Sequence, residues 1–99
     1  MTDGVQEPSL VSLGSLIQQG RVATEGLWAH PDDSAGRRHV GELIAQVRSE
    51  ATVLGQVAML PVCDEVGPMA NSAPTPQAVE ILIGGFETLA RLWRATQKH

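Results

Sequence analysis

The sequence predicts an all-α fold, an antiparallel four-helix bundle in which residues 1–99 form a single domain. Three observations support this prediction. Apolar residues recur at spacings of three and four along four stretches of the chain, as they do on one face of a helix. Turn-forming residues separate these stretches. With 99 residues, of which 42% are hydrophobic, the chain has room for one core and not for two.

The first helix is expected to begin after Ser9, a residue type that caps helix N-termini, while the polar and acidic residues 1–8 are expected to be flexible. Three glycines, Gly14, Gly20 and Gly26, each weaken the helix by about 1 kcal/mol relative to alanine. We therefore expect that packing must hold this helix together, and that Gly20 is where it would break. The spacing predicts a core face made of Leu10, Leu13, Ile17, Gly20, Thr24 and Leu27.

A turn at His30–Gly36, H-P-D-D-S-A-G, is expected to precede the second helix, with Asp33 or Ser34 as its N-cap. Gly55 and Pro61 separate this helix from a shorter third helix, expected over roughly Val57 to Val66. Gly67-Pro68 should end the third helix. The predicted core face of the second helix is Val40, Leu43, Ile44, Val47, Ala51 and Leu54.

The last helix is expected to begin at Thr75-Pro76, an N-cap followed by the proline favoured at the first helical position, after a surface connection over residues 67–74. Its predicted core face is Val79, Leu82, Ile83, Phe86, Leu89, Ala90 and Trp93. A second stripe widens the apolar arc and has two interpretations: contact with a second copy of the chain, or coverage by the first helix. This stripe is Ile81, Gly85, Thr88 and Leu92.

Composition excludes several classes of function. The net charge is −4 and the seven Lys and Arg residues are scattered, which argues against a nucleic-acid partner. No apolar run approaches the roughly 18 residues that a membrane span needs. The lone cysteine, Cys63, cannot form an internal disulfide and is expected to be a buried small hydrophobe. We expect a cytoplasmic protein without a cofactor.

The stretch Leu43–Val66 resembles the core of the histidine phosphotransfer domain, whose motif is H-x-L-K-G-S-x-x-x-L-G followed by a short helix with apolar, Cys and acidic positions. Val47 takes the place of the motif's Leu, Arg48 that of its Lys and Ser49 that of its Gly, and Leu54-Gly55 match the closing L-G. Ala51 falls near a small position of the motif. The short helix is matched by Val62, Cys63 and Glu65.

In this alignment Ala45 stands where the family has its phosphorylated histidine, and an alanine side chain has no nucleophilic atom. The resemblance therefore implies a phosphotransfer scaffold without the chemistry: a non-enzymatic adaptor of two-component signalling that docks a response-regulator receiver or a histidine kinase. The expected partner-binding surface is Ala45, Gln46, Arg48, Ser49 and Ala51. The alternative is a self-associating regulatory subunit that uses the stripe on the last helix and has no role in a phosphorelay.

Two other histidine-containing features compete with this interpretation. His39 is a candidate substitute phosphoacceptor on the same helix, but it precedes Ala45 by six residues, which is not a whole number of turns. It would point to a different side of the helix, so we expect an exposed surface histidine. The string A-H-P-D-D at residues 29–33 resembles the zinc motif of PIG-L-type N-acetylglucosamine deacetylases, which would make His30 and Asp33 metal ligands. That family has a much larger α/β domain and a further histidine ligand, so we expect turn formation and capping here and no metal.

Overall fold

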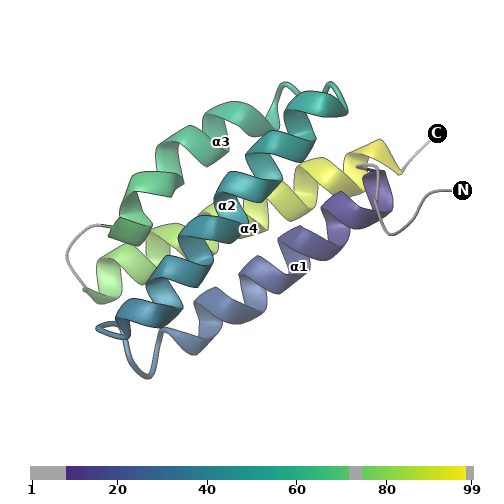
Figure 1. The fold of residues 1–99 in the computed structure, drawn as a ribbon. Coiled ribbons are helices and arrows are strands. Elements are labelled where there is room, and N and C mark those ends of the chain that lie inside the picture. Colours follow the sequence, from purple (N-terminus) through teal and green to yellow (C-terminus); the bar gives the residue numbers. More distant parts are fainter. Residues whose placement is uncertain (1–8, 72–74, 98–99) are drawn as a thin grey trace, which may run out of the picture.

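The computed structural model describes residues 9–71 and 75–97, and these residues form a bundle of four α-helices (Figure 1). The helices are α1 (Leu10–Gly26), α2 (Ser34–Val53), α3 (Met59–Val66) and α4 (Pro76–Thr96), and a 3-10 helix, η1 (Gly67–Asn71), continues α3. Successive helices run in opposite directions. Both α2 and α4 pack against α1 and α3, and they lie diagonally across the bundle from one another. The predicted antiparallel four-helix bundle is confirmed.

Three of the helices begin at the residues that the sequence predicts. The hydroxyl of Ser9 accepts a hydrogen bond from the backbone N–H of Ser12 at 3.1 Å, as an N-cap does. Asp33 accepts in the same way from Gly36 at 3.1 Å. At the start of α4 the hydroxyl of Thr75 accepts from the N–H of Ala78 at 3.2 Å, and Pro76 is the first helical residue.

A Schellman motif ends α2. Gly55 has a φ of 73°, a left-handed conformation that glycine adopts without a Cβ penalty. The N–H of Gln56 donates to the carbonyl of Ala51 at 2.8 Å, and the N–H of Gly55 donates to that of Thr52 at 3.2 Å. The Leu54-Gly55 pair therefore ends the helix and turns the chain toward α3.

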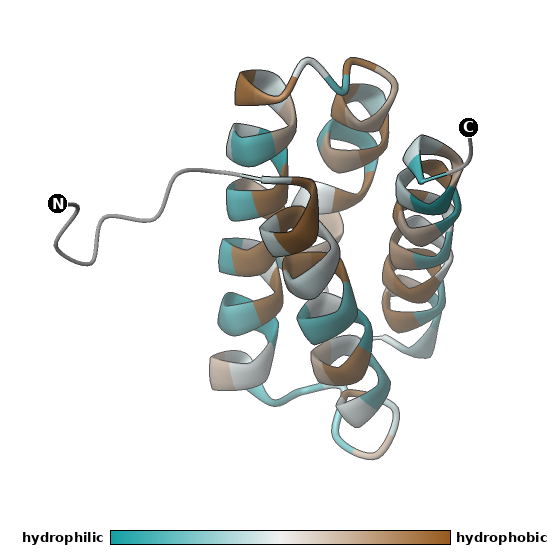
Figure 2. Ribbon diagram, turned by 90° about the vertical axis from the view of Figure 1, so that its right-hand side faces the viewer, coloured by the Kyte–Doolittle hydropathy of each residue, from teal (hydrophilic) through white to brown (hydrophobic). Residues whose placement is uncertain are grey.

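The core lies along the bundle axis, and Figure 2 shows the hydrophobic stripes of the helices turned toward it. Of the 19 residues predicted to face the core, 14 are buried, and the other five, Leu10, Leu54, Ile83, Ala90 and Trp93, are half-buried. Cys63 is buried, as predicted. The largest fully buried side chains are those of Phe86, Leu13, Met59, Leu82, Leu89, Val40, Val47, Val79 and Thr24.

The structure decides three local predictions. Helix α1 is continuous through Gly20, because the lost helix propensity is offset by packing: Gly20 is buried against the ring of Phe86. Helix α3 begins at Met59, two residues later than expected. The connection after Val66 is a 3-10 helix whose Ala70 is buried, so part of it belongs to the core. The expectations for residues 1–8 and for the end of this connection, residues 72–74, lie outside the described residues.

Candidate functional site

The outer face of α2 carries the residues that the sequence predicts to bind a partner. Ala45, Gln46, Arg48 and Ser49 are all exposed. They point outward because Ile44, Val47 and Ala51 repeat at helical spacing and take the opposite face into the core. We call Ala45, Gln46, Arg48 and Ser49 the α2 surface.

Ala51 does not belong to the α2 surface, and its assignment as a partner-binding residue is corrected here. Its exposed fraction is 0%, and it packs in the hydrophobic core. The reason is its spacing: Ala51 follows Val47 by four residues, about one turn, so both point the same way. A partner that docks on α2 cannot contact the side chain of Ala51.

An ion pair fixes the position of Arg48. Its Nε donates to Oδ1 of Asp64 in α3 at 2.7 Å, and its Nη2 lies 3.5 Å from Oδ2 of the same carboxylate. The hydrogen bond and the opposite charges raise the pKa of Arg48 above its ordinary value. The same hydrogen bond, followed by the charge of Arg48, lowers the pKa of Asp64. The side chains remain 49% and 57% exposed, so the pair is open to a partner and to salt.

Cys63 precedes Asp64 in the sequence, but its thiol faces the core. It is 2% exposed, and its burial, together with the charge of Asp64, raises its pKa to about 11. A thiol is a nucleophile only as the thiolate. Near neutral pH Cys63 therefore serves as a small apolar side chain of α3.

The histidine and aspartate residues of the A-H-P-D-D string form no metal site in the described part of the chain. His30 is exposed in the turn before α2, and the carboxylate of Asp33 caps that helix. Within residues 9–71 and 75–97, no group of three or more His, Cys, Asp or Glu side chains is placed to hold a metal ion. His39 is exposed on α2, nearer to its N-terminus than the α2 surface.

The apolar stripe predicted on α4 divides into exposed and covered parts. Ile81 is 46% exposed. Gly85 is buried against Val66 of α3, so the close contact at this position lies within the chain. Thr88 donates its hydroxyl to the carbonyl of Gly84 at 3.0 Å, and Leu92 is half-buried against the core. Of the four residues, Ile81 alone presents a large exposed apolar side chain.

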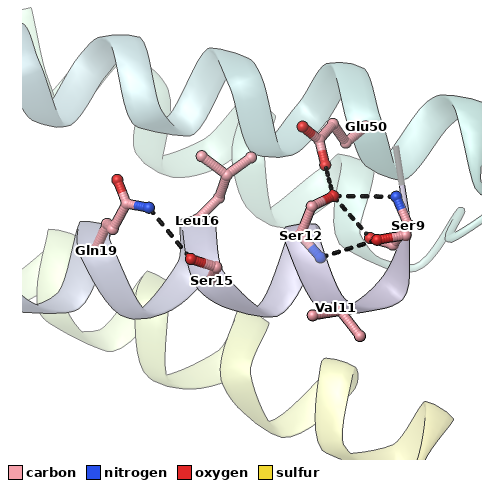
Figure 3. Close-up of a pocket in the computed structure, with 7 residues that line it drawn as sticks. All are labelled: Ser9, Val11, Ser12, Ser15, Leu16, Gln19 and Glu50. Atoms are coloured by element: carbon pink, nitrogen blue, oxygen red, sulfur yellow. Dashed lines mark hydrogen bonds between the residues drawn. The ribbon is translucent and has the colours of Figure 1, made fainter. Parts of the chain in front are cut away.

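One polar cluster was not predicted from the sequence. The hydroxyl of Ser12 in α1 donates to Oε1 of Glu50 in α2 at 2.8 Å and accepts from the N–H of Ser9 at 3.0 Å (Figure 3). These residues line a surface hollow of about 530 Å³, which Val11, Ser15, Leu16 and Gln19 complete. The S-x-x-S cap was visible in the sequence, but its contact with Glu50 depends on the packing of two helices. None of the α2 surface residues lines this hollow.

Comparisons of the chain with protein-family models, curated proteins and solved structures find no match. None of the described helices combines the length and hydrophobicity needed to cross a bilayer.

Proposed function

We propose that this chain is a non-catalytic protein-binding module of the histidine phosphotransfer type, which docks a receiver domain or a histidine kinase without accepting phosphate. The observation that carries the proposal is the exposure of Ala45, Gln46, Arg48 and Ser49 together on one face of α2. The resemblance of Leu43–Val66 to the phosphotransfer motif names these same positions as the docking residues.

The chemistry of the α2 surface suits close docking. Ala45 and Ser49 are four residues apart, so their small side chains lie next to each other and let a partner approach the helix backbone. Arg48, beside them, presents a guanidinium group that suits a carboxylate or a phosphoryl group. Its bond to Asp64 favours one orientation of the guanidinium, while 49% of the side chain stays exposed to a partner.

The proposed module acts by binding its partner, without transferring a phosphoryl group. Phosphotransfer to a histidine breaks the bond between phosphorus and an aspartate oxygen of the receiver and forms a bond to an imidazole nitrogen. The methyl group of Ala45 offers no electron pair for that bond. The effect would be sequestration or scaffolding of the partner, and the compartment would be the cytoplasm, where Cys63 stays reduced.

The sharpest test is to restore the missing histidine. Ala45→His in the full-length chain, incubated with phosphorylated receiver domains from the same organism, should acquire an acid-labile label that the wild-type chain does not. Gln46→His is the matched control, because it places the same imidazole one position along the same helix. Label on neither variant, with no complex formed by the wild-type chain, would contradict the proposal. Label on the wild-type chain that His39→Ala abolishes would overturn its non-catalytic part.

A second test addresses docking alone. We expect Arg48→Glu to weaken a complex with a receiver domain or a kinase at least tenfold, since it reverses the charge at the centre of the α2 surface. Arg38→Glu makes the same change of net charge on exposed α2 surface away from the site and should bind like the wild-type chain. Circular dichroism of both variants checks that the bundle is intact.

The alternative function is self-association through α4, and the 46% exposure of Ile81 is the observation that favours it. Ile81→Glu is the suitable variant, because Leu92 packs against the core and its replacement would disturb the fold. A dimer that forms with rising concentration in the wild-type chain and dissociates in Ile81→Glu would support self-association. A monomer at all concentrations would exclude it.

A further inference from the structure

A second surface, away from the α2 surface, lies in the groove between α1 and α4. The groove has a volume of about 310 Å³, near the lower end of the range for ligand sites. Gly14, Ile17 and Arg21 line it from α1, and Ala90, Trp93 and Arg94 line it from α4.

The middle of the groove is apolar and its aromatic wall is held in place. The indole of Trp93 lies against Gly14, where a Cβ atom would come within 2.5 Å of the ring. Trp93 also donates its Nε1–H to the backbone carbonyl of Leu10 at 2.6 Å, so the ring cannot swing away without losing that bond. The half-buried Ala90 completes the accessible apolar lining, Ile17 lies beneath it in the core at 2% exposure, and Gln18 adds one polar side chain to the rim.

A cation stands at each end of this apolar stretch. Arg94 follows Trp93, whose indole lies against Gly14, so Arg94 is near Gly14 along the bundle axis. Arg21 is seven residues from Gly14 along α1. Seven residues of helix span about 10 Å at 1.5 Å per residue. In the described part of the chain neither Arg21 nor Arg94 has a carboxylate oxygen within ion-pair distance, and the Nε–H of Arg94 donates to the backbone carbonyl of Ala90 at 3.4 Å. Both cations of the groove can therefore take a carboxylate of a partner.

The groove is thus basic at both ends and apolar between them, on a chain whose net charge is −4. This pattern complements an amphipathic helix that carries two acidic residues seven positions apart and apolar residues three and four positions after the first. The acidic residues of such a helix are also about 10 Å apart, and its apolar residues lie on the same face between them. Laying an apolar helix face into a hydrophobic groove is a common mode of peptide recognition.

We propose that the groove between α1 and α4 binds an acidic amphipathic helix of a partner protein, with Arg21 and Arg94 pairing its carboxylates and the half-buried Ala90 and Trp93 receiving its apolar side chains. This site is separate from the α2 surface and does not depend on the function proposed for that surface. A chain that also binds a partner at the α2 surface would bridge two proteins, and this bridging role alone rests on the function proposed for that surface.

The probe is a fluorescein-labelled helical peptide with the core Glu-Ala-Ala-Leu-Leu-Ala-Ala-Glu between helix-forming flanks, titrated with the full-length chain and followed by fluorescence anisotropy. A peptide with Gln at both Glu positions is the matched control and should bind at least tenfold more weakly. Equal binding of the two peptides, or binding of neither, would overturn the proposal.

Charge reversal in the protein locates the site. Arg21→Glu and Arg94→Glu should each weaken binding of the acidic peptide about fivefold, in keeping with the strength of surface ion pairs, while Arg38→Glu should leave it unchanged. The double variant with both groove arginines reversed should instead prefer the peptide that carries Lys in place of Glu. If Arg38→Glu weakens binding as much as the groove variants, or if the double variant does not change its preference, the peptide is bound elsewhere and the proposal fails.

Discussion

Gly20 in α1 lies directly against the aromatic ring of Phe86 in α4. A Cβ atom placed on Gly20 would overlap the ring, and Phe86 is completely buried in the core, so the ring cannot swing out into solvent. The absence of a side chain at Gly20 therefore sets how closely α1 and α4 approach at the middle of the bundle. The same relation holds between Gly14 and Trp93 near one end of the two helices, and between Gly85 and Val66 where α4 meets α3.

Replacing Gly20 with alanine should therefore destabilise the fold. Alanine improves the helix propensity by about 1 kcal/mol, but forcing an extra carbon into a filled core typically costs about 1 to 3 kcal/mol. Because the overlap with Phe86 is severe, we expect Gly20→Ala to lower the free energy of unfolding by about 1 to 2 kcal/mol, measured by urea denaturation.

Adjacent glycines in α4 provide a matched comparison for this effect. A Cβ on Gly84 meets nothing within 4 Å, whereas a Cβ on Gly85 would lie 2.5 Å from Cγ1 of Val66. We expect Gly84→Ala to stabilise the chain by about 0.5 to 1 kcal/mol and Gly85→Ala to destabilise it. Similar effects of the two substitutions on the denaturation midpoint would show that helix propensity, and not packing, governs these positions.

Cys63 should make stability fall at alkaline pH. Burial raises its pKa from 9.0 to about 11, so the folded chain keeps its thiol proton in a range where the unfolded chain loses it. Below pH 9 the thiol is protonated in both the folded and the unfolded chain and does not affect stability. As pH rises from 9 toward 11, only the unfolded chain loses the proton, and the free energy of unfolding falls. A difference of about two pKa units corresponds to roughly 2 to 3 kcal/mol at most.

The check is the unfolding free energy from pH 8 to pH 11 for the wild-type chain and for Cys63→Ala, which keeps a small apolar side chain but cannot ionise. The difference between the two curves isolates the thiol from other groups that titrate in this range. The wild-type curve should fall more steeply above pH 9, and parallel curves would rule out the raised pKa.

Arg48 should control the titration of Asp64. The hydrogen bond and the charge of Arg48 hold the pKa of Asp64 below its ordinary value, so this pair stabilises the fold above that value and ceases to do so as pH falls through the lowered pKa. In Arg48→Gln the pKa of Asp64 should return toward the ordinary value near 4, as measured by carbon-detected NMR of the carboxyl group. An unchanged titration of Asp64 in this variant would show that Arg48 does not pair with it in solution.

Local chemistry predicted much of this fold. Ser9, Asp33 and Thr75 are caps that act within three residues, and the core faces follow from helical periodicity along single segments. The roles of the glycines could not be predicted in this way, because the ring that fills the space beside Gly20 belongs to Phe86, a residue distant in sequence. The sequence indicated that packing had to hold α1 despite its glycines, but not that Gly20 itself is the contact surface.

The site was predicted less completely than the fold, for the same physical reason. The exposure of Ala45 and Ser49 follows from the period of α2. The same period placed Ala51 in the predicted core face, where the structure has it, and only the motif resemblance assigned it to the partner-binding surface. The bond between Arg48 and Asp64 depends on the register of α2 against α3, which no single segment specifies. The groove between α1 and α4 likewise exists only once the two helices have packed.

Trp93 should stabilise the start of α1 through its indole hydrogen bond. Its Nε1–H donates to the carbonyl of Leu10 at 2.6 Å and so ties the last turns of α4 to the first turn of α1. Trp93→Phe removes this donor together with part of the buried ring, and we expect a loss of about 1 to 2 kcal/mol in the free energy of unfolding. Trp28→Phe is the matched control, because Trp28 is 48% exposed, and it should cost about 0.5 kcal/mol or less.

Circular dichroism suits both variants, since tryptophan fluorescence changes with the substitutions themselves. Amide exchange should also quicken in the first turns of α1 in Trp93→Phe alone, and equal exchange in the two variants would mean that the indole bond does not hold these helix ends together.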